Sequence, residues 1–179
     1  MIVGIKGIQD CGKTAIAVAT IFELVAHHGY QWSEVVSNIL IRRQGVNCVT
    51  NEVMRTFITR MVSGGIKHKI ILIDEADRIF PSRFWQDREQ SDALIGLWQD
   101  VKLFNWIIYT AHIGTSVDIM LRQTTQIGII PLYVKGSDLI KFTIFNALYQ
   151  RTIKETAENV SKTIFPYYDR WEPVKPINA

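Results

Sequence analysis

Eight residues close to the N-terminus, GIQDCGKT at positions 7–14, match the pattern GxxxxGK[ST] in full. Gly7 and Gly12 permit the backbone angles of a tight loop. The N–H groups of such a loop converge on phosphate oxygens, Lys13 can place its ammonium group beside the outer phosphates, and the Thr14 hydroxyl can bind Mg²⁺. The residues predicted to bind ATP are therefore Gly7, Gln9, Asp10, Cys11, Gly12, Lys13 and Thr14.

The segments on either side of this loop decide between a phosphate site and a chance glycine turn. Residues 2–6 are mostly aliphatic and predict a short buried strand, and residues 13–28 carry apolar side chains at helical spacing. A strand before the loop and a helix after it are the context that the motif requires, so a phosphate site is favoured. Asp10 is discordant, because a carboxylate repels a triphosphate, and we expect its side chain to face solvent.

A second pair of reactive residues, Asp74 and Glu75, directly follows an aliphatic run at 70–73. In a parallel sheet this strand and the strand before the phosphate loop deliver their C-terminal ends to the same edge. Asp74 can then hold Mg²⁺, and Glu75 can polarise a water for attack on the γ-phosphate. The pair favours hydrolysis over transfer to a bound hydroxyl; the competing interpretation is a strand end carrying two solvated acids.

The rest of the chain predicts the elements that position these residues. Further strands are expected at 35–41, 69–73 and 106–110, further helices at 51–62, 82–101 and 116–121, and a β-hairpin at 127–134 and 139–145. Strands that alternate with helices indicate an α/β domain. We therefore expect one domain over 1–179 with the P-loop NTPase fold, in which helices flank a mostly parallel central sheet and a C-terminal hairpin follows.

The end of the chain, residues 150–179, has less regular patterning. Pro166, Pro173 and Pro176 argue for an irregular tail, above all from about residue 165 onward. The chain has no internal repeat, no low-complexity segment and no linker. We therefore expect no second domain.

Composition sets limits on the class of protein. The chain has 179 residues, of which 47% are hydrophobic and 21% charged, with a formal net charge of +3. These values are ordinary for a globular protein, and the two cysteines, Cys11 and Cys48, do not make a disulfide framework. We expect a reducing, cytoplasmic setting. The first residues do not form a signal peptide, and no stretch reaches the roughly 20 apolar residues of a membrane helix.

Taken together, these motifs resemble the FtsK–HerA superfamily of DNA-pumping ATPases, and within it the small viral genome-packaging ATPases. The Zot-type assembly ATPases of filamentous phages are similar too. The resemblance runs from about residue 2 to residue 172, and its most specific segments are the loop at 7–14, IILIDEADRIFPSR at 70–83, YTAHIGTSVDIMLR at 109–122 and YYDRWE at 167–172.

The resemblance implies a role for each matching residue. Lys13 and Thr14 would bind nucleotide and metal, Asp74 would be the metal-binding acid and Glu75 the catalytic acid. Arg122 lies where the family places an arginine that reaches the nucleotide of a neighbouring subunit. A surface arginine that closes a helix is the competing interpretation, and the rival arginines are Arg78, Arg83 and Arg88.

The sequence departs from the family at His112, where a glutamine usually senses the γ-phosphate. Histidine can also donate to phosphate, although its charge depends on pH. Thr110 is a candidate to share the sensing role, and a purely structural His112 is an equal alternative.

The resemblance further implies an ATP-hydrolysing motor that translocates double-stranded DNA into a viral capsid. Its expected partners are further copies of itself in a ring, expected to be hexameric, and a capsid or portal vertex component, in the host cytoplasm or with the virion. Arg42-Arg43 and 67–69 are candidate DNA contacts, and solvated loops are the bland alternative. The alternative functions are a Zot-type assembly ATPase and an ATP-binding switch with little turnover.

Overall fold

The computed structural model describes residues 1–64, 69–80, 105–113, 119–134 and 136–169. The predicted helix over 82–101 lies outside these residues, as does part of the one predicted over 116–121. The strands are β1 (Ile2–Gly7), β2 (Val35–Ser37), β3 (Leu40–Ile41), β4 (Asn47–Cys48), β5 (Ile70–Ile73), β6 (Trp106–His112), β7 (Ile127–Val134), β8 (Leu139–Asn146), β9 (Arg151–Glu158) and β10 (Tyr168–Asp169). The α-helices are α1 (Lys13–His27), α2 (Asn51–Gly64), α3 (Ala76–Ile79), α5 (Ile119–Gln123) and α6 (Val160–Thr163), and 3₁₀ turns occur at η1 (Trp32–Glu34) and η4 (Phe165–Tyr167).

Eight strands form the central sheet in the order β4-β2-β5-β6-β1-β7-β8-β9. All pairs from β4 to β7 are parallel, and β7, β8 and β9 are antiparallel. Strand β6 lies between β5 and β1, so the acid pair and the phosphate loop follow strands that are separated by one strand. This arrangement confirms the predicted mostly parallel sheet and the predicted β7–β8 hairpin.

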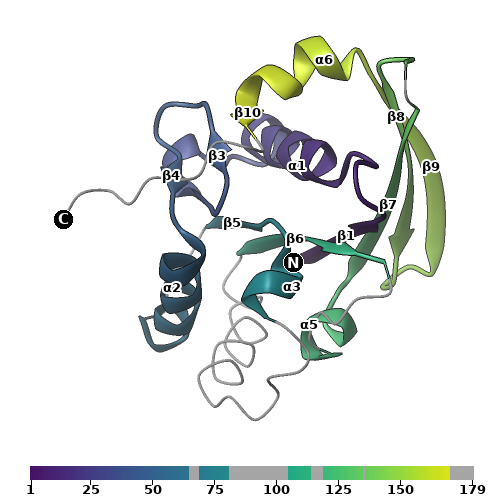
Figure 1. Cartoon of the computed structure of the whole chain (residues 1–179). Helices are drawn as coiled ribbons and strands as arrows, with labels where there is room; N and C mark the ends of the chain where they lie inside the picture. The colour runs from purple at the N-terminus through teal and green to yellow at the C-terminus, as the bar shows by residue number, and fades with distance from the viewer. Residues whose placement is uncertain (65–68, 81–104, 114–118, 135, 170–179) are drawn as a thin grey trace.

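Helices cover both faces of the sheet, with α1 and α6 on one face and α2, α3 and α5 on the other (Figure 1). Strand β5 shows why its sequence is aliphatic throughout. Ile71 and Ile73 pack into the core that contains side chains of α2 and α3, whereas Ile70 and Leu72 pack into the core that contains side chains of α1. Successive side chains of a strand point to opposite faces, so a strand covered on both sides is apolar at every position.

The single strand predicted over 35–41 is wrong in one respect, because two strands of different sheets occupy it. Strand β2 ends at Ser37, and β3 pairs with β10 in a separate two-stranded sheet. Between them, the Ser37 hydroxyl accepts the N–H of Ile39 at 3.1 Å, and the side chain of Asn38 bonds to the backbone of Asp74. These side-chain bonds turn the chain out of the main sheet.

The irregular end predicted from residue 150 onward is also wrong over 151–169, where β9, α6, η4 and β10 form. Strand β9 has the sequence RTIKETAE and is almost entirely exposed. It pairs with β8 along its whole length. Because almost all of its side chains are exposed, the strand carries no alternation of apolar and polar residues that a sequence could reveal. Residues 170–179 lie outside the described part.

The other predicted elements are close to the observed ones. Helix α2 begins after Thr50, whose hydroxyl accepts the N–H of Val53 at 3.3 Å, and β6 continues two residues further than predicted, to His112. Cys11 and Cys48 are both free thiols. Within the described residues, no helix has the length and apolar character needed to cross a membrane.

Candidate functional site

The predicted phosphate loop connects the end of β1 to the first turn of α1 with little spare space. Gly12 has φ +93°, and a Cβ there would lie 2.8 Å from Cδ1 of the buried Ile140. A Cβ on Gly7 would press against Sγ of Cys11. Glycine at position 12 is therefore favoured by its backbone angle, and a side chain at position 7 would have to displace the Cys11 thiol.

Lys13 bridges the loop from within. Its Nζ donates to the carbonyl oxygen of Gly7 at 3.2 Å and to that of Ile8 at 2.6 Å, and the residue is only 7% exposed. An anion placed over the loop competes with these two carbonyls for the ammonium group. Asp10 is exposed, as expected, with φ 57°, and it also lines the cleft beside the loop.

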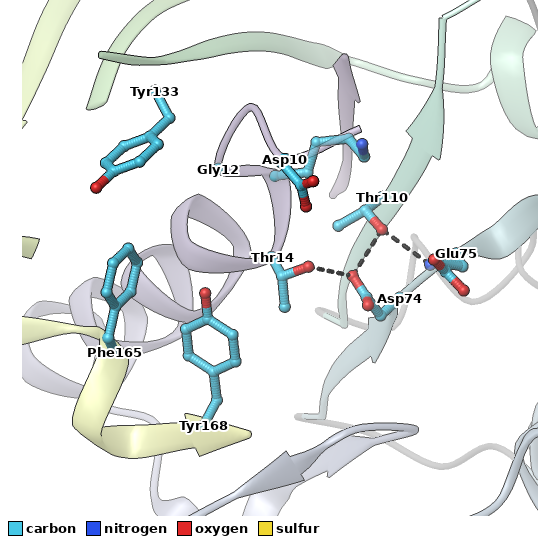
Figure 2. A pocket seen from close by; sticks show the side chains of 10 residues that line it. Asp10, Gly12, Thr14, Asp74, Glu75, Thr110, Tyr133, Phe165 and Tyr168 are labelled. Carbon is cyan, nitrogen blue, oxygen red and sulfur yellow. Dashed lines mark hydrogen bonds between the residues drawn. The ribbon is translucent and has the colours of Figure 1, made fainter. Parts of the chain in front are cut away.

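A chain of hydrogen bonds joins the loop to the acid pair. The hydroxyl of Thr14 donates to Oδ1 of Asp74 at 3.0 Å, and that of Thr110 donates to the same oxygen at 2.7 Å. Oγ1 of Thr110 in turn accepts the N–H of Glu75 at 2.8 Å. Figure 2 shows these bonds on one side of the cleft. The loop and the acids therefore meet at one edge of the sheet, as the parallel arrangement predicts.

Asn38 holds the backbone of Asp74 and has no counterpart in the sequence analysis. Its Oδ1 accepts the N–H of Asp74 at 2.6 Å, and its Nδ2 donates to the carbonyl oxygen of Asp74 at 2.8 Å. The same Nδ2 donates to Oδ1 of Asn51, the first residue of α2. An amide at the end of β2, beside the strand that carries the acids, is a signal visible only once the strand order is known.

Glu75 is engaged by an arginine of its own helix. Nε of Arg78 lies 2.8 Å from Oε2 of Glu75, with the arginine side chain 69% exposed and the glutamate 25%. Glu75 itself has φ 52°, the left-handed conformation, at the N-terminus of α3. Of the rival arginines, Arg83 and Arg88 lie outside the described residues.

His112 points toward helix α3. Its Nδ1 lies 3.5 Å from Oδ2 of Asp77. Thr110, two residues earlier on β6, is the residue that bonds to the carboxylate of Asp74 and to the backbone N–H of Glu75; the sequence indicated it only as a candidate to share the sensing role. In the described part of the chain, the cleft lining includes Thr110 and not His112.

Arg122 is exposed on α5, and among the described residues it does not line the cleft. Its charge acts instead on the end of β1. Burial lowers the pKa of Lys6, and the nearby Arg122 lowers it further. Arg122 is thus presented at the surface of this chain.

Of the candidate DNA-binding residues, Arg42 and Arg43 make contacts within the protein. The guanidinium of Arg43 lies over the rings of Tyr167, Phe22 and Trp32, at 4.1, 5.0 and 5.6 Å from their centroids. The backbone N–H of Arg42 donates to the carbonyl oxygen of Tyr167 at 2.7 Å. Arg43 therefore has a structural role, whereas residues 67 and 68 lie outside the described part.

Three aromatic residues complete the cleft, and sequence reasoning missed them as site residues. Tyr133 of β7, Phe165 of η4 and Tyr168 of β10 line it together with the loop and the acids. They lie on the opposite side of the cleft from Asp74 and Glu75 (Figure 2).

Comparisons with known proteins agree with this geometry. The model of the ATPase family associated with various cellular activities (AAA) matches residues 3–130. A search of curated protein sequences gives no significant match.

Solved structures of similar fold cover most of the chain. The N-terminal domain of zonular occludens toxin from Neisseria meningitidis is 14% identical with a TM-score of 0.63, covering 94% of this chain and 98% of that one. The genome packaging NTPase B204 from Sulfolobus turreted icosahedral virus 2, in complex with ATP-gammaS, is 13% identical with a TM-score of 0.59, covering 86% and 95%. B204, the DNA-packaging ATPase from Sulfolobus turreted icosahedral virus, is 12% identical with a TM-score of 0.61, covering 86% and 96%. These similarities confirm the predicted P-loop NTPase fold.

Proposed function

Because the chain belongs to the ATPase family associated with various cellular activities, we propose that it is an ATP-hydrolysing motor that translocates double-stranded DNA, as a viral genome-packaging ATPase does. The observation that carries the hydrolytic part is the bonded chain from Thr14 through Asp74 and Thr110 to Glu75. It brings a phosphate-binding loop and two acids to one cleft. A nucleotide whose phosphates lie on the loop would therefore have a carboxylate within reach of its terminal phosphate.

The residues beside the loop fit a magnesium ion. Oγ1 of Thr14 and Oδ1 of Asp74 lie 3.0 Å apart, and both residues are less than 10% exposed. Mg²⁺ prefers oxygen ligands and is usually held by one or two protein groups together with phosphates. Thr14 and Asp74 would hold it, and when bound it would neutralise part of the charge on the β- and γ-phosphates.

The remaining residues supply binding and proton transfer. Lys13 would exchange its two loop carbonyls for phosphate oxygens when ATP binds, since an ammonium–phosphate bond is charge-assisted. Glu75 would accept the proton of the attacking water. Arg78 occupies one oxygen of this carboxylate and restrains its movement, and the bond from the N–H of Glu75 to Thr110 keeps the backbone in place.

The DNA-translocating part of the proposal rests on the similarity of the fold to that of B204 and on the exposure of Arg122. The structure named as B204, the DNA-packaging ATPase, has this fold over 86% of the chain. Arg122 is exposed, so it can reach the nucleotide of a neighbouring copy in a ring, where a cation stabilises the charge that develops on the γ-phosphate. The family resemblance makes a hexamer the expected ring, with a capsid or portal component as a further partner.

The central test separates binding from hydrolysis and transport. Glu75→Gln should bind ATP with unchanged affinity and release no phosphate in the steady state, whereas Lys13→Ala should lose binding as well. DNA-stimulated phosphate release and displacement of a DNA-bound roadblock are measured on the same samples. A Glu75→Gln protein that moves DNA at the wild-type rate would remove the proposed mechanism.

The match to the zonular occludens toxin domain favours a second candidate, a phage assembly ATPase of the Zot type. Both candidates hydrolyse ATP, so the discriminating measurement is the effect of DNA. Duplex DNA that does not change the rate of ATP hydrolysis, at any protein concentration that permits assembly, would favour the Zot-type role. An ATP-binding switch predicts no steady-state phosphate release with or without DNA.

A further inference from the structure

The cleft beside the phosphate loop continues, away from the acid pair, to three partly buried aromatic rings. Tyr133, Phe165 and Tyr168 come from β7, η4 and β10, which are separate segments of the C-terminal part of the chain. Figure 2 shows them across Thr14 from Glu75 and Thr110. The cleft therefore has a polar end with two carboxylates and an aromatic end, with the loop between them.

The three rings form one cluster without stacking face to face. The centroids of Tyr133 and Phe165 are 6.3 Å apart with an interplanar angle of 64°, and those of Phe165 and Tyr168 are 6.2 Å apart with an angle of 84°. Neither pair is parallel, so no ring of a pair covers the face of its neighbour with its own face. All three residues line the cleft, so each contributes surface to it.

The segment that carries Phe165 and Tyr168 is fixed on both sides. Val160 and Ile164 are buried in the core beside α1, and β10 pairs with β3 through Tyr168 and Ile41. Tyr167, between the two lining residues, accepts the N–H of Arg42 and lies under the guanidinium of Arg43. Rings held in this way need little further ordering when a ligand binds, which favours affinity.

We propose that Tyr133, Phe165 and Tyr168 form the site for the base of the nucleotide. The inference rests on the proposed nucleotide binding at the loop, which fixes the phosphates over Gly12 and Lys13 and leaves the rest of the ligand to extend along the cleft. Glu75 and Thr110 mark the end where the terminal phosphate is attacked, so the base lies at the other end. Aromatic side chains stack on the flat faces of nucleobases, which are planar and apolar on those faces.

A binding comparison tests the site directly. Dissociation constants for ATP and for inorganic tripolyphosphate, both with Mg²⁺, are measured for the wild type and for Phe165→Ala and Tyr168→Ala. We expect each substitution to weaken ATP on the order of tenfold, the range found for a lost base–aromatic stack, and to leave tripolyphosphate within about twofold. Tyr168→Phe, which keeps the ring, should bind ATP as the wild type does. Tyr149→Ala is the matched control, since Tyr149 is 78% exposed between β8 and β9.

The outcomes separate the base site from the proposed function. Equal loss of both ligands would mean that the substitutions distort the loop, and unchanged ATP affinity would mean that the base lies elsewhere; either result overturns the base site alone. Wild-type protein that binds neither ligand would overturn nucleotide binding itself. Lys13→Ala is the reference here and should weaken both ligands.

A second measurement needs no variant and so does not depend on folding of the substituted proteins. Photolysis with 8-azido-ATP should label the tryptic peptide 163–170, TIFPYYDR, or the peptide that contains Tyr133. Excess ATP and excess tripolyphosphate should both suppress the labelling, because each occupies the loop that binds the phosphates of the probe. Labelling confined to other peptides would contradict the assignment.

Discussion

Oγ1 of Thr110 lies 2.7 Å from Oδ1 of Asp74 and joins the middle of the sheet to the end of β5. Its oxygen also accepts the N–H of Glu75, so one buried hydroxyl is bonded to the carboxylate of Asp74 and to the backbone of Glu75. Strand β6 makes this possible because it lies between β5 and β1, directly beside the acid pair. The threonine therefore orients the carboxylate of the proposed metal-binding acid and fixes the backbone of the proposed catalytic acid.

Replacement of this hydroxyl should reduce hydrolysis more than binding. Thr110→Val keeps the shape of the side chain and leaves Asp74 and the N–H of Glu75 each without this partner, at a cost of about 1–3 kcal/mol for an unsatisfied buried group. We expect kcat to fall about tenfold, in line with an energy of this size, with a smaller change in ATP affinity. Thr110→Ser, which retains the hydroxyl, is the matched control in a steady-state ATPase assay. A Thr110→Val enzyme with wild-type kcat would show that the bond has no part in orienting the acids.

The sequence predicted the parts of this site that are local in the chain. Gly7, Gly12, Lys13 and Thr14 are consecutive parts of one motif, and Asp74 and Glu75 follow an aliphatic run whose burial on both faces is visible in its composition. Their meeting at one edge follows from the parallel sheet. For these residues the pattern and the topology lead to the same geometry.

The parts that were missed depend on contacts between distant segments. Asn38 matters because β2 lies beside β5, and no spacing in the sequence announces that pairing. Phe165 and Tyr168 reach the cleft because β10 pairs with β3, more than a hundred residues earlier in the chain. Strand β9 was missed for another reason, since an exposed edge strand carries no alternation of apolar residues.

The contact between Arg78 and Glu75 predicts a faster enzyme when it is removed. The guanidinium occupies one oxygen of the carboxylate that we propose as the base, so that oxygen accepts a proton only after the pair has broken, and the pair also restrains the side chain. Exposed ion pairs contribute at most about 1 kcal/mol, which corresponds to a rate increase of up to about fivefold. Arg78→Ala should therefore raise basal ATP hydrolysis by about two- to fivefold and leave the melting temperature nearly unchanged.

The control for this prediction is Arg151→Ala, which removes an exposed arginine of β9. Added salt should raise the wild-type rate toward that of Arg78→Ala, because salt screens exposed pairs. If Arg78→Ala lowers kcat, then the arginine positions Glu75 for catalysis and does not restrain it.

Gly12 should tolerate no side chain, for two separable reasons. Its φ of +93° is costly for any residue with a Cβ, by about 1–3 kcal/mol, and that Cβ would also press on Ile140. Gly29→Ala is the matched control, since Gly29 has φ +74° and open space around it. Both variants should melt at a lower temperature than the wild type, and only Gly12→Ala should lose ATP affinity. Equal ATP affinity in the two variants would mean that the loop geometry does not determine binding.

The exposure of Arg122 allows a test of whether neighbouring subunits share an active site. The Arg122→Ala protein keeps an intact phosphate loop but lacks the arginine, and the Lys13→Ala protein keeps the arginine but lacks a working loop. If Arg122 completes the active site of the next copy, the two variants can complement each other. Each protein alone should hydrolyse ATP about 100-fold more slowly than the wild type, as when a group that stabilises the transition-state charge is removed. In a mixture, an Arg122→Ala loop can face the arginine of a Lys13→Ala neighbour, so the rate should exceed the sum of the two separate rates.

The dependence of the ATPase rate of the mixture on protein concentration distinguishes an active site shared between subunits from one within a single chain. Recovery in the mixture should grow with total concentration and disappear on dilution, because it requires contact between copies. Lys162→Ala is an appropriate control for loss of a positive charge, since Lys162 is exposed on α6. A mixture whose rate equals the sum of its parts, or an Arg122→Ala protein with the wild-type rate, would assign Arg122 to the surface of the helix alone. In that case the in-trans group has to be sought among the other arginines, with Arg78 excluded if its removal accelerates hydrolysis.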